Sequence, residues 1–338
     1  MIRVGVAGLG MMGRTHLEVY RRRRDVEVVA VADCDPARLA GAAAGSNIAA
    51  LGAAVLDLGG VRRYTDAEEL ILDPGVDLVD ICLPTPLHAA AVRAAIAAGK
   101  HVLVEKPPAR TAAEARALAD LAERASTITM PALCMRFWPG WTWLKEAVDR
   151  GTWGRPRGVS FQRLGAVLPG ASYRDSAQSG GAILDLHLHD TDFVRHLFGW
   201  PRAVTSFGYS HLSGEIDHVL TRYDYAAADL VTAEGAWMAS AGFPFTMRYV
   251  ADFEHATATY DFAADPPLVL YRRGRPPEPV PLEAGLGYDH EIAYLLDCIH
   301  AGCRPERATM AAAAAAVAIV EMESRSVKTG RTVEGKAS

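Results

Sequence analysis

The chain has 338 residues, a length that favours two domains at roughly 100 to 200 residues per domain. Half of the residues are hydrophobic and 22% are charged, which is typical of globular proteins and excludes disorder, collagen and coiled coil. The net charge of -5 supplies no basic surface for a phosphate backbone, so we expect no nucleic-acid partner. Five of the 35 basic residues are lysine, which makes a lysine a rare choice in this chain.

The cysteine and hydropathy patterns predict a cytoplasmic protein. The five cysteines are scattered without a C-x-x-C pair, which is typical of reduced thiols. The N-terminus begins directly on an apolar strand pattern and shows no secretory signal. The longest apolar run, Met310 to Val320, is shorter than the roughly 20 residues of a membrane span. It predicts an Ala-rich buried helix, and we expect no membrane partner.

The first 130 residues alternate between strand-like apolar runs and helical stretches. The expected strands are Ile2 to Ala7, Val26 to Asp33, Val76 to Cys82, His101 to Glu105 and Ser126 to Met130. The expected helices are Thr15 to Arg23, Pro36 to Ala44, Asp66 to Leu72, Leu87 to Ala98 and Thr111 to Arg124. This alternation predicts an α/β domain on a parallel sheet, because parallel strands need a crossover of about a dozen residues.

The remaining residues have a different pattern. Apolar and polar residues alternate in Arg157 to Arg163, Ala203 to Tyr209, His218 to Ala226, Thr232 to Ser240 and Thr246 to Phe253. Such alternation predicts a mostly antiparallel sheet. Pro266 to Pro281 is predicted to be an exposed connection. We place the boundary between Arg124 and Trp138, which divides the chain into residues 1–125 and 126–338.

A glycine-rich loop follows the first predicted strand directly. It reads Gly-Leu-Gly-Met-Met-Gly, a G-x-G-x-x-G pattern between a strand and a helix. These glycines allow a tight turn, backbone approach to a pyrophosphate and close packing of the helix, whose N-terminus faces the anion. We therefore expect a dinucleotide to bind at Gly8, Leu9, Gly10, Met11, Met12 and Gly13.

Asp33 ends the second predicted strand about 20 residues after Gly13, as dinucleotide-binding domains require. Its carboxylate suits a ribose 2′-hydroxyl and repels a 2′-phosphate, so NAD is favoured over NADP. Arg38 is nearer to this position than the basic run from Arg21 to Arg24 and keeps NADP as the alternative.

Five motifs of the chain resemble one family in their order and spacing. They are VAGLGMMGRTH at the N-terminus, ICLPTPLH at Ile81 to His88, VEKPPA at Val104 to Ala109, MRFWP at Met135 to Pro139 and GGAILDLHLHDTDF at Gly180 to Phe193. The family is the Gfo/Idh/MocA oxidoreductases, named for glucose-fructose oxidoreductase and inositol dehydrogenase. The resemblance implies an N-terminal doubly wound Rossmann domain and a C-terminal α+β domain with an open, mainly antiparallel sheet. It also implies homodimers or homotetramers formed through that sheet.

The resemblance implies further cofactor contacts after the glycine loop. They are Leu83, Pro84, Thr85, His88, Glu105 and Lys106. The family often has Thr-Pro-Asn where this chain has Leu83-Pro84-Thr85, so a threonine hydroxyl replaces an amide on the nicotinamide side.

Lys106 follows the strand from His101 to Glu105, at the carboxyl edge where ligands bind in open α/β sheets. A partly buried lysine can share or lose a proton, whereas arginine cannot be deprotonated. Together with the resemblance, this predicts that Lys106 orients the reacting oxygen of an alcohol. The alternative is an ordinary solvated loop lysine.

Asp185 and His189 have i, i+4 spacing, which places them on one face of a helix. The carboxylate then holds the imidazole in one tautomer and raises its basicity. We expect His189 to act as the general acid/base and Asp185 to support it. The alternative is an internal hydrogen-bond partner and a satisfied core histidine.

His187 lies between these two residues. With His189, Asp190 and Asp192 it offers metal-ligand types, but this dense cluster lacks the third His or Cys of an open zinc site, so we expect no metal. On a helix His187 points away from His189, and we expect it to line an interface or another part of the pocket. The resembled family commonly has a small residue there, which implies that the imidazole narrows the substrate range.

Three further residues are candidate substrate contacts. Arg136, in the RF motif, binds substrate or the nicotinamide amide, or else forms an interdomain salt bridge. Tyr173, with Arg174, lies in a loop shortly before the glycine pair. Tyr288, in GYDHE, occupies a place where the family often has a substrate-facing tyrosine.

These residues together predict an NAD(P)-dependent dehydrogenase. It would transfer a hydride between nicotinamide and a secondary alcohol of a sugar, polyol or related cyclic hydroxyl compound. Residues 1–125 would bind the dinucleotide, and residues 126–338 would bind the substrate and oligomerise. One alternative is an NAD-dependent glycosidase or lyase that uses transient oxidation without net redox change. The other is a non-catalytic nucleotide-sensing protein.

Overall fold

The computed structural model describes residues 1–43, 55–167 and 171–335. They form two compact units. The first comprises Met1–Cys134 and Tyr288–Ala315, and the second comprises Met135–Gly287 and Ala316–Ser338. The boundary expected at residue 125 assigned Tyr288–Ala315 to the second domain, whereas this segment packs with the first unit.

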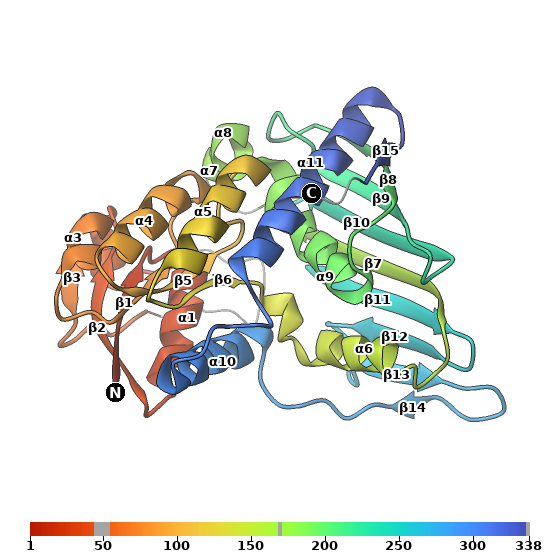
Figure 1. The fold of residues 1–338 in the computed structure, drawn as a ribbon, viewed down its shortest axis with the longest axis horizontal. Helices are drawn as coiled ribbons and strands as arrows, with labels where there is room; N and C mark the ends of the chain where they lie inside the picture. The colour runs from red at the N-terminus through yellow and green to blue at the C-terminus, as the bar shows by residue number, and fades with distance from the viewer. Residues whose placement is uncertain (44–54, 168–170, 336–338) are drawn as a thin grey trace. The chain divides into compact units, whose positions relative to one another are not determined.

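The first unit contains the predicted parallel sheet (Figure 1). The order β3-β2-β1-β4-β5-β6 is that of doubly wound dinucleotide-binding folds. The strands are β1 (Ile2–Ala7), β2 (Val26–Ala32), β3 (Arg62–Tyr64), β4 (Leu78–Ile81), β5 (His101–Glu105) and β6 (Thr129–Ala132). Strand β3 was not predicted, because its three residues, RRY, form no apolar run.

Six helices accompany this sheet within the described residues. They are α1 (Met11–Arg21), α2 (Pro36–Leu39), α3 (Ala67–Leu72), α4 (Thr85–Ala97), α5 (Ala112–Arg124) and α10 (Gly287–Ala301). Helix α1 packs on β1 and β2, while α3, α4 and α5 pack side by side. The helix predicted over Pro36 to Ala44 ends at Leu39, close to Gly41, whose φ is +93°. Ala44 lies outside the described residues.

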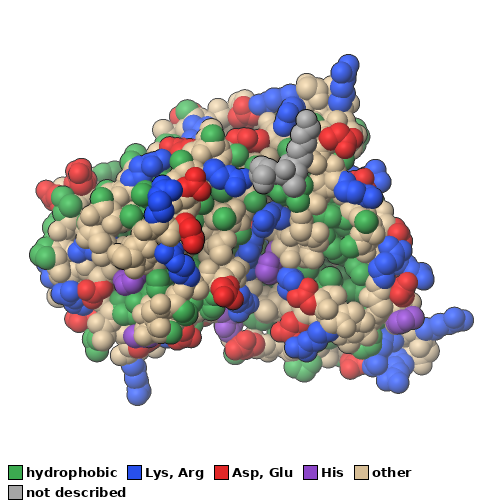
Figure 2. Space-filling model, in the orientation of Figure 1, with side chains coloured by type: hydrophobic (Ala, Val, Ile, Leu, Met, Phe, Trp, Pro, Cys, Tyr) green, Lys and Arg blue, Asp and Glu red, His purple; other side chains and the backbone are tan. Residues whose placement is uncertain are grey.

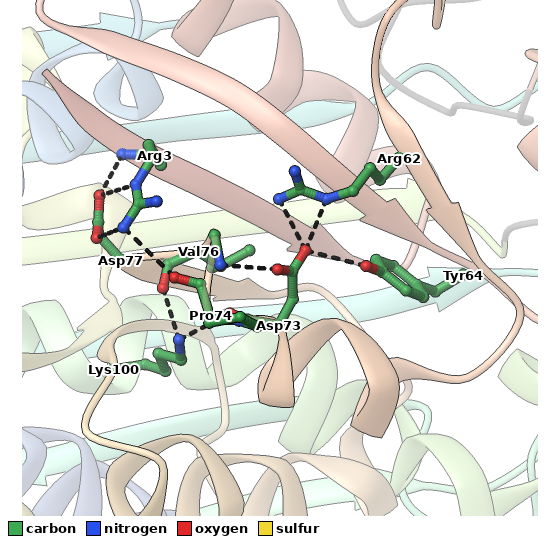
Figure 3. A network of polar contacts seen from close by, with 9 residues as sticks. Arg3, Arg62, Tyr64, Asp73, Pro74, Val76, Asp77 and Lys100 are labelled. Carbon is green, nitrogen blue, oxygen red and sulfur yellow. Dashed lines mark hydrogen bonds and ion pairs between the residues drawn. The ribbon is translucent and has the colours of Figure 1, made fainter.

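Polar side chains hold the amino ends of the parallel strands (Figure 3). Arg3 Nε donates to Asp77 at 2.9 Å. Lys100 Nζ donates to the backbone carbonyls of Asp73 at 2.8 Å and Val76 at 2.7 Å. Lys100, one of the five lysines, therefore stabilises the fold at the edge of the sheet opposite the glycine loop.

The second unit contains a nine-stranded sheet in the order β14-β13-β12-β11-β7-β10-β9-β8-β15. Its strands are β7 (Pro156–Ala166), β8 (Ala203–Tyr209), β9 (His218–Asp224), β10 (Leu230–Met238), β11 (Thr246–Phe253), β12 (Thr257–Asp261), β13 (Leu268–Tyr271), β14 (Glu278–Pro279) and β15 (Val333–Glu334). The β7–β10 pair is parallel and the other described pairs are antiparallel. The mostly antiparallel sheet is confirmed.

The exposed connection predicted over Pro266 to Pro281 is wrong in part. It contains β13 and β14, and β13 pairs with β12, a strand that was also not predicted. Leu268 and Leu270 are buried, so a short apolar run extends the sheet within a segment rich in proline and arginine.

The helices of the second unit lead up to the predicted catalytic motif. They are the 3-10 helix η1 (Cys134–Arg136), α6 (Pro139–Asp149), α7 (Ala171–Arg174), α8 (Ser176–Ser179), the π-helix η2 (Ile183–His187) and α9 (Leu188–Phe198). Helix α9 packs on β7 and β10, and α6 packs on α9 (Figure 1). The Ala-rich helix is α11 (Met310–Thr329), which extends beyond its predicted end at Val320.

The described chain has no helix that is long and apolar enough to cross a membrane. Its five cysteines are free thiols. On the face shown in Figure 2, basic and acidic side chains are interspersed.

Candidate functional site

The glycine loop fits a pyrophosphate. A Cβ on Gly13 would lie 1.8 Å from the Gly8 carbonyl oxygen, and one on Gly8 would lie 2.4 Å from the Cys82 carbonyl oxygen. A Cβ on Gly10 would meet no atom within 4 Å. The loop therefore combines two close backbone contacts with one open approach at the start of α1, as a bound dinucleotide requires.

Asp33 lies beside this loop and is nearly buried. Its Oδ2 accepts the Leu9 N–H at 2.8 Å, and its Oδ1 accepts the Asp35 N–H at 2.9 Å. Arg38 Nη1 is 3.4 Å from the same carboxylate. The two residues that bear on the choice between NAD and NADP are thus neighbours at the end of β2.

His88 connects the loops that follow β4 and β5. Its Nδ1 lies 2.8 Å from the Pro107 carbonyl oxygen, and its Nε2 lies 2.6 Å from the Leu83 carbonyl oxygen. The ring is buried, whereas Pro84 is exposed and Thr85 is half-buried. His88 therefore holds the two loops that carry the predicted nicotinamide-side contacts.

Lys106 is half-buried at the carboxyl end of β5. Its backbone N–H donates to Oε2 of Glu105 at 3.1 Å. Glu105 is nearly buried, so the carboxylate next to the predicted reactive lysine points back into the first unit.

Glu105 belongs to a buried group that we name the His16 cluster: His16, Asp80, Glu105 and Glu291. His16 has no exposed surface, and its Nδ1 is 2.9 Å from Asp80 Oδ2. Its Nε2 lies 3.5 Å from Glu105 and 4.0 Å from Glu291. Burial lowers the pKa of His16, but the three carboxylates outweigh burial and raise the pKa to about 9.

The two glutamates of this cluster also have raised pKa values. Burial raises the pKa of Glu105, and it raises the pKa of Glu291 well above its ordinary value, while His16 opposes both shifts. The Tyr288 ring packs 6.1 Å from the His16 ring and is nearly buried. The His16 cluster thus connects α1, β4, β5 and α10 next to Lys106.

The His16 cluster was not predicted from the sequence. One signal was available: Asp80 is a charged residue within a fully buried strand, β4. A buried carboxylate needs a partner, but the sequence does not show which helix supplies it.

His16, Asp80 and Cys82 bring metal-ligand atoms together within the described part of the chain. Cys82 Sγ donates to Asp80 Oδ1 at 3.3 Å. Burial and the Asp80 charge raise the pKa of the Cys82 thiol well above its ordinary value, so the thiol stays protonated. Asp80 thus forms hydrogen bonds with both the His16 ring and the Cys82 thiol.

Asp185 and His189 lie in the second unit, on η2 and α9. Both are half-buried, whereas residues 186–188 and 190–192 are buried. The two predicted catalytic side chains are therefore the accessible polar residues of this stretch. A continuous α-helix was expected here, but a π-helix precedes α9 and changes the angular offset between the two side chains.

Two buried ion pairs fix the other face of α9. Arg136 donates to Asp192 through Nε at 2.8 Å and through Nη2 at 2.6 Å. Arg163 donates to Asp190 through Nε at 2.8 Å and through Nη2 at 2.9 Å. Arg136, a predicted substrate contact, thus forms an ion pair inside the second unit.

Two other predicted residues of this unit pack in its interior. Tyr173 was expected in a loop, but it lies on the short helix α7. Its ring lies 5.9 Å from the Trp237 ring and is half-buried. His187 has no exposed surface, so the expectation that it lines a pocket or an interface is wrong. Its side chain packs against Gly235 of β10, which leaves room for the imidazole.

Comparison with known proteins defines the class. Residues 2–133 match the oxidoreductase family with an NAD-binding Rossmann fold, so the first unit contains an NAD(P)-binding domain. Residues 141–259 match the GFO/IDH/MocA C-terminal domain. The chain belongs to the Gfo/Idh/MocA oxidoreductases.

Two dehydrogenases are among the proteins whose sequences are similar to this chain. Over 198 residues the chain is 32% identical to myo-inositol 2-dehydrogenase of Thermotoga maritima, with 59% of this chain and 55% of that protein covered. Over 230 residues it is 31% identical to trans-1,2-dihydrobenzene-1,2-diol dehydrogenase of Homo sapiens, with 66% and 65% covered. The match thus spans less than two thirds of either relative.

The fold of the whole chain is similar to that of levoglucosan dehydrogenase, solved in complex with NADH and levoglucosan. The TM-score is 0.84 at 21% identity, with 99% of this chain and 100% of that chain covered. At this identity the likeness concerns the fold.

Proposed function

We propose that the protein is an NAD-dependent dehydrogenase that oxidises a secondary alcohol of a sugar, polyol or related cyclic hydroxyl compound. One observation carries the proposal: in the otherwise buried stretch of residues 185–192, Asp185 and His189 are half-buried. A carboxylate and an imidazole that solvent reaches, in a member of an oxidoreductase family, are suited to move the proton of an alcohol. The inositol and dihydrodiol dehydrogenases among the relatives support the substrate class.

Each catalytic residue has a distinct role in this proposal. NAD would supply the nicotinamide that accepts the hydride. Lys106 orients the alcohol oxygen, and His189 takes the hydroxyl proton. Asp185 keeps the imidazole in one tautomer and favours its protonated form.

The substrate contacts are proposed by the same reasoning. Tyr173 is half-buried and packs against a hydrophobic cluster that includes Ala182 and Leu186 of the motif. Arg136 and Tyr288 are nearly buried, so their contribution is to hold Asp192 and the His16 ring in place.

The activity test is a panel of sugars, polyols and cyclic diols with NAD, followed by NADH absorbance. With an active substrate, His189→Ala and Lys106→Met should each reduce turnover by about 10² or more. NADH affinity should survive His189→Ala. A matched control is His300→Ala, because His300 is exposed on α10. Unchanged turnover in His189→Ala would contradict the proposal.

The same assay separates the alternatives. Consumption of a glycoside without NADH accumulation would indicate a glycosidase or lyase that uses transient oxidation. NADH binding without turnover of any compound would indicate a nucleotide-sensing protein.

Cofactor choice is tested by comparing kcat/KM for NAD and NADP. Asp33 supports NAD, because its carboxylate repels a 2′-phosphate. A strong preference for NADP would contradict this role and assign the phosphate to Arg38.

We also propose that copies of the chain associate through the open face of the nine-stranded sheet. Four exposed apolar side chains share this face: Phe207, Leu220, Leu230 and Val250. Light scattering should detect a dimer or tetramer, and Phe207→Asp should dissociate it. A wild-type monomer at micromolar concentration would contradict this part of the proposal.

A further inference from the structure

His187 is buried between the two proposed catalytic residues in the sequence, and its surroundings give it a role. Its Nε2 lies 3.3 Å from Tyr223 Oη on β9 and 3.4 Å from Glu323 Oε2 on α11. Tyr223 Oη donates to Glu323 Oε1 at 2.7 Å, and Thr191 Oγ1 donates to the same oxygen at 3.0 Å. We name His187, Thr191, Tyr223 and Glu323 the His187 cluster. It ties the end of η2 to the sheet and to α11.

Gly235 on β10 provides the space for the imidazole. A Cβ built at Gly235 would lie 2.8 Å from both Cβ and Nδ1 of His187. Its φ is outside the left-handed region, so the backbone does not require glycine. Glycine weakens a strand interior, and it marks places of close approach. The bulk at position 187 and the missing side chain at position 235 are therefore complementary.

The neighbours of Gly235 strengthen this arrangement. In the parallel β7–β10 pair, Gly235 lies opposite Arg163. Arg163 holds Asp190 of α9 through two hydrogen bonds. Adjacent positions of the sheet thus receive His187 at the end of η2 and Asp190 in the first turn of α9. Contacts on both sides, His187 with Gly235 and Asp190 with Arg163, therefore hold the junction between η2 and α9.

The junction matters because η2 is a π-helix. Its hydrogen bonds run from i to i+5, so the turn is wider than in an α-helix and the phase of the side chains shifts. Asp185 lies within this turn, and His189 lies just after it. Any change at the junction alters the placement of the carboxylate relative to the imidazole. Single π-turns inside helices are rare and frequently occur at functional sites.

We propose that His187 is a positioning residue: seated on Gly235 and tied to Tyr223 and Glu323, it holds the π-turn that sets Asp185 relative to His189. The role rests on the proposed function, which assigns the proton transfer to these two residues. His187 itself touches neither substrate nor cofactor, since it has no exposed surface.

The test is a double-mutant cycle at positions 187 and 235. Gly235→Ala should lower kcat by about tenfold or more, because displacements of about 1 Å at a reacting group cost up to 10² in rate. His187→Gly should also lower kcat. In the His187→Gly background, Gly235→Ala should cause a much smaller further loss, because both atoms that its Cβ would meet at 2.8 Å, Cβ and Nδ1 of His187, are gone. His187→Gln keeps an amide N–H near the position of Nε2 and should retain most of the activity.

A matched control is Gly158→Ala on the adjacent strand β7. A Cβ at Gly158 would meet its nearest atom at 3.8 Å, which is ordinary contact. This variant should keep wild-type kcat, and NADH affinity should be unchanged in all variants. The acid limb of the kcat profile should move to lower pH in Gly235→Ala, because an imidazole that loses its carboxylate partner has a lower pKa. A role confined to stability would leave this limb in place.

Hydrogen–deuterium exchange of residues 183–192 provides a readout that does not depend on turnover. Gly235→Ala should accelerate exchange there when His187 is present and should add much less after His187→Gly. If no compound yields NADH but this exchange pattern holds, the proposed function fails while the holding role of His187 stands. Equal losses of kcat from Gly235→Ala in both backgrounds, or exchange unaffected by Gly235→Ala, would overturn the positioning role.

Discussion

Each unit of the molecule buries one histidine completely, and the two surroundings differ in charge. His16 in the first unit faces three carboxylates, Asp80, Glu105 and Glu291. His187 in the second unit faces the carboxylate of Glu323, which also accepts hydrogen bonds from Tyr223 and Thr191.

The difference separates two ways to stabilise a buried imidazole. In the His16 cluster the carboxylates outnumber the cation, so its stability depends on the charge of the ring. In the His187 cluster neutral hydroxyl groups share the carboxylate, and Gly235 supplies the space, so stability depends on hydrogen bonds and shape. Substitutions that change charge while keeping size should therefore act strongly in the first unit and weakly in the second.

The largest effect is expected for His16→Gln. Glutamine keeps an amide near the ring nitrogens but leaves Asp80, Glu105 and Glu291 without a cation, and breaking a buried ion pair costs about 3 to 5 kcal/mol. Urea unfolding at neutral pH measures the loss in the free energy of unfolding. The matched control is His187→Gln, for which we expect a loss of about 1 kcal/mol, the value of a hydrogen bond. Equal losses in the two variants would remove the distinction between the clusters.

The pH dependence of stability sharpens the same comparison. The pKa of His16 rises from 6.5 to about 9 in the folded protein, so its stabilisation is complete below pH 6.5 and is lost as the pH rises through 9. Over this range the free energy of unfolding should fall by about 3 kcal/mol. In His16→Gln the decline between pH 6.5 and 9 should be absent, because the ring that loses its proton over this range is gone. A decline at the same pH in both proteins would assign it to other groups.

The sequence predicts the first sheet well, because its signals are local. The apolar runs of β1, β2, β4 and β5 and the glycine loop each lie within a few consecutive residues. The His16 cluster is different, since it joins side chains of α1, β4, β5 and α10. Its members come together only when α10, near the end of the chain, packs with the first unit.

The second unit shows the same limit at its candidate site. The sequence motif predicts Asp185 and His189 as a pair, and helical spacing places His187 on a different face of the helix. The π-helix could not be predicted from the local sequence. It coincides with a contact between His187 and Gly235, which lies on a strand about 50 residues further along the chain. A glycine in a strand interior is weak evidence for a close contact until the residue that packs against it is known.

A smaller effect is expected when one carboxylate of the His16 cluster is neutralised in the His16→Gln variant. Asp80→Asn in the His16→Gln background should restore part of the lost stability, because it removes a buried carboxylate whose imidazole partner, 2.9 Å away in the wild type, is gone. The coupling between the two positions should be about 0.5 to 3 kcal/mol, as found for residues in direct contact. Urea unfolding of the two single variants and the double variant measures it. Purely additive losses would show that Asp80 and His16 do not stabilise each other.

The smallest effect is expected for Tyr223→Phe in the second unit. The substitution removes one hydroxyl from the His187 cluster, while Glu323 keeps its bond from Thr191 and its contact with His187, so the cost should be about 1 kcal/mol. Burial raises the pKa of Tyr223 well above its ordinary value, so the hydroxyl stays protonated and this cost should be constant from pH 6.5 to 9. The matched control is Tyr209→Phe, which removes an exposed hydroxyl that lies 3.0 Å from His218 and should cost less. If the Tyr223→Phe loss exceeded that of His16→Gln, or changed steeply over this pH range, charge would govern both clusters and the contrast between the two units would be false.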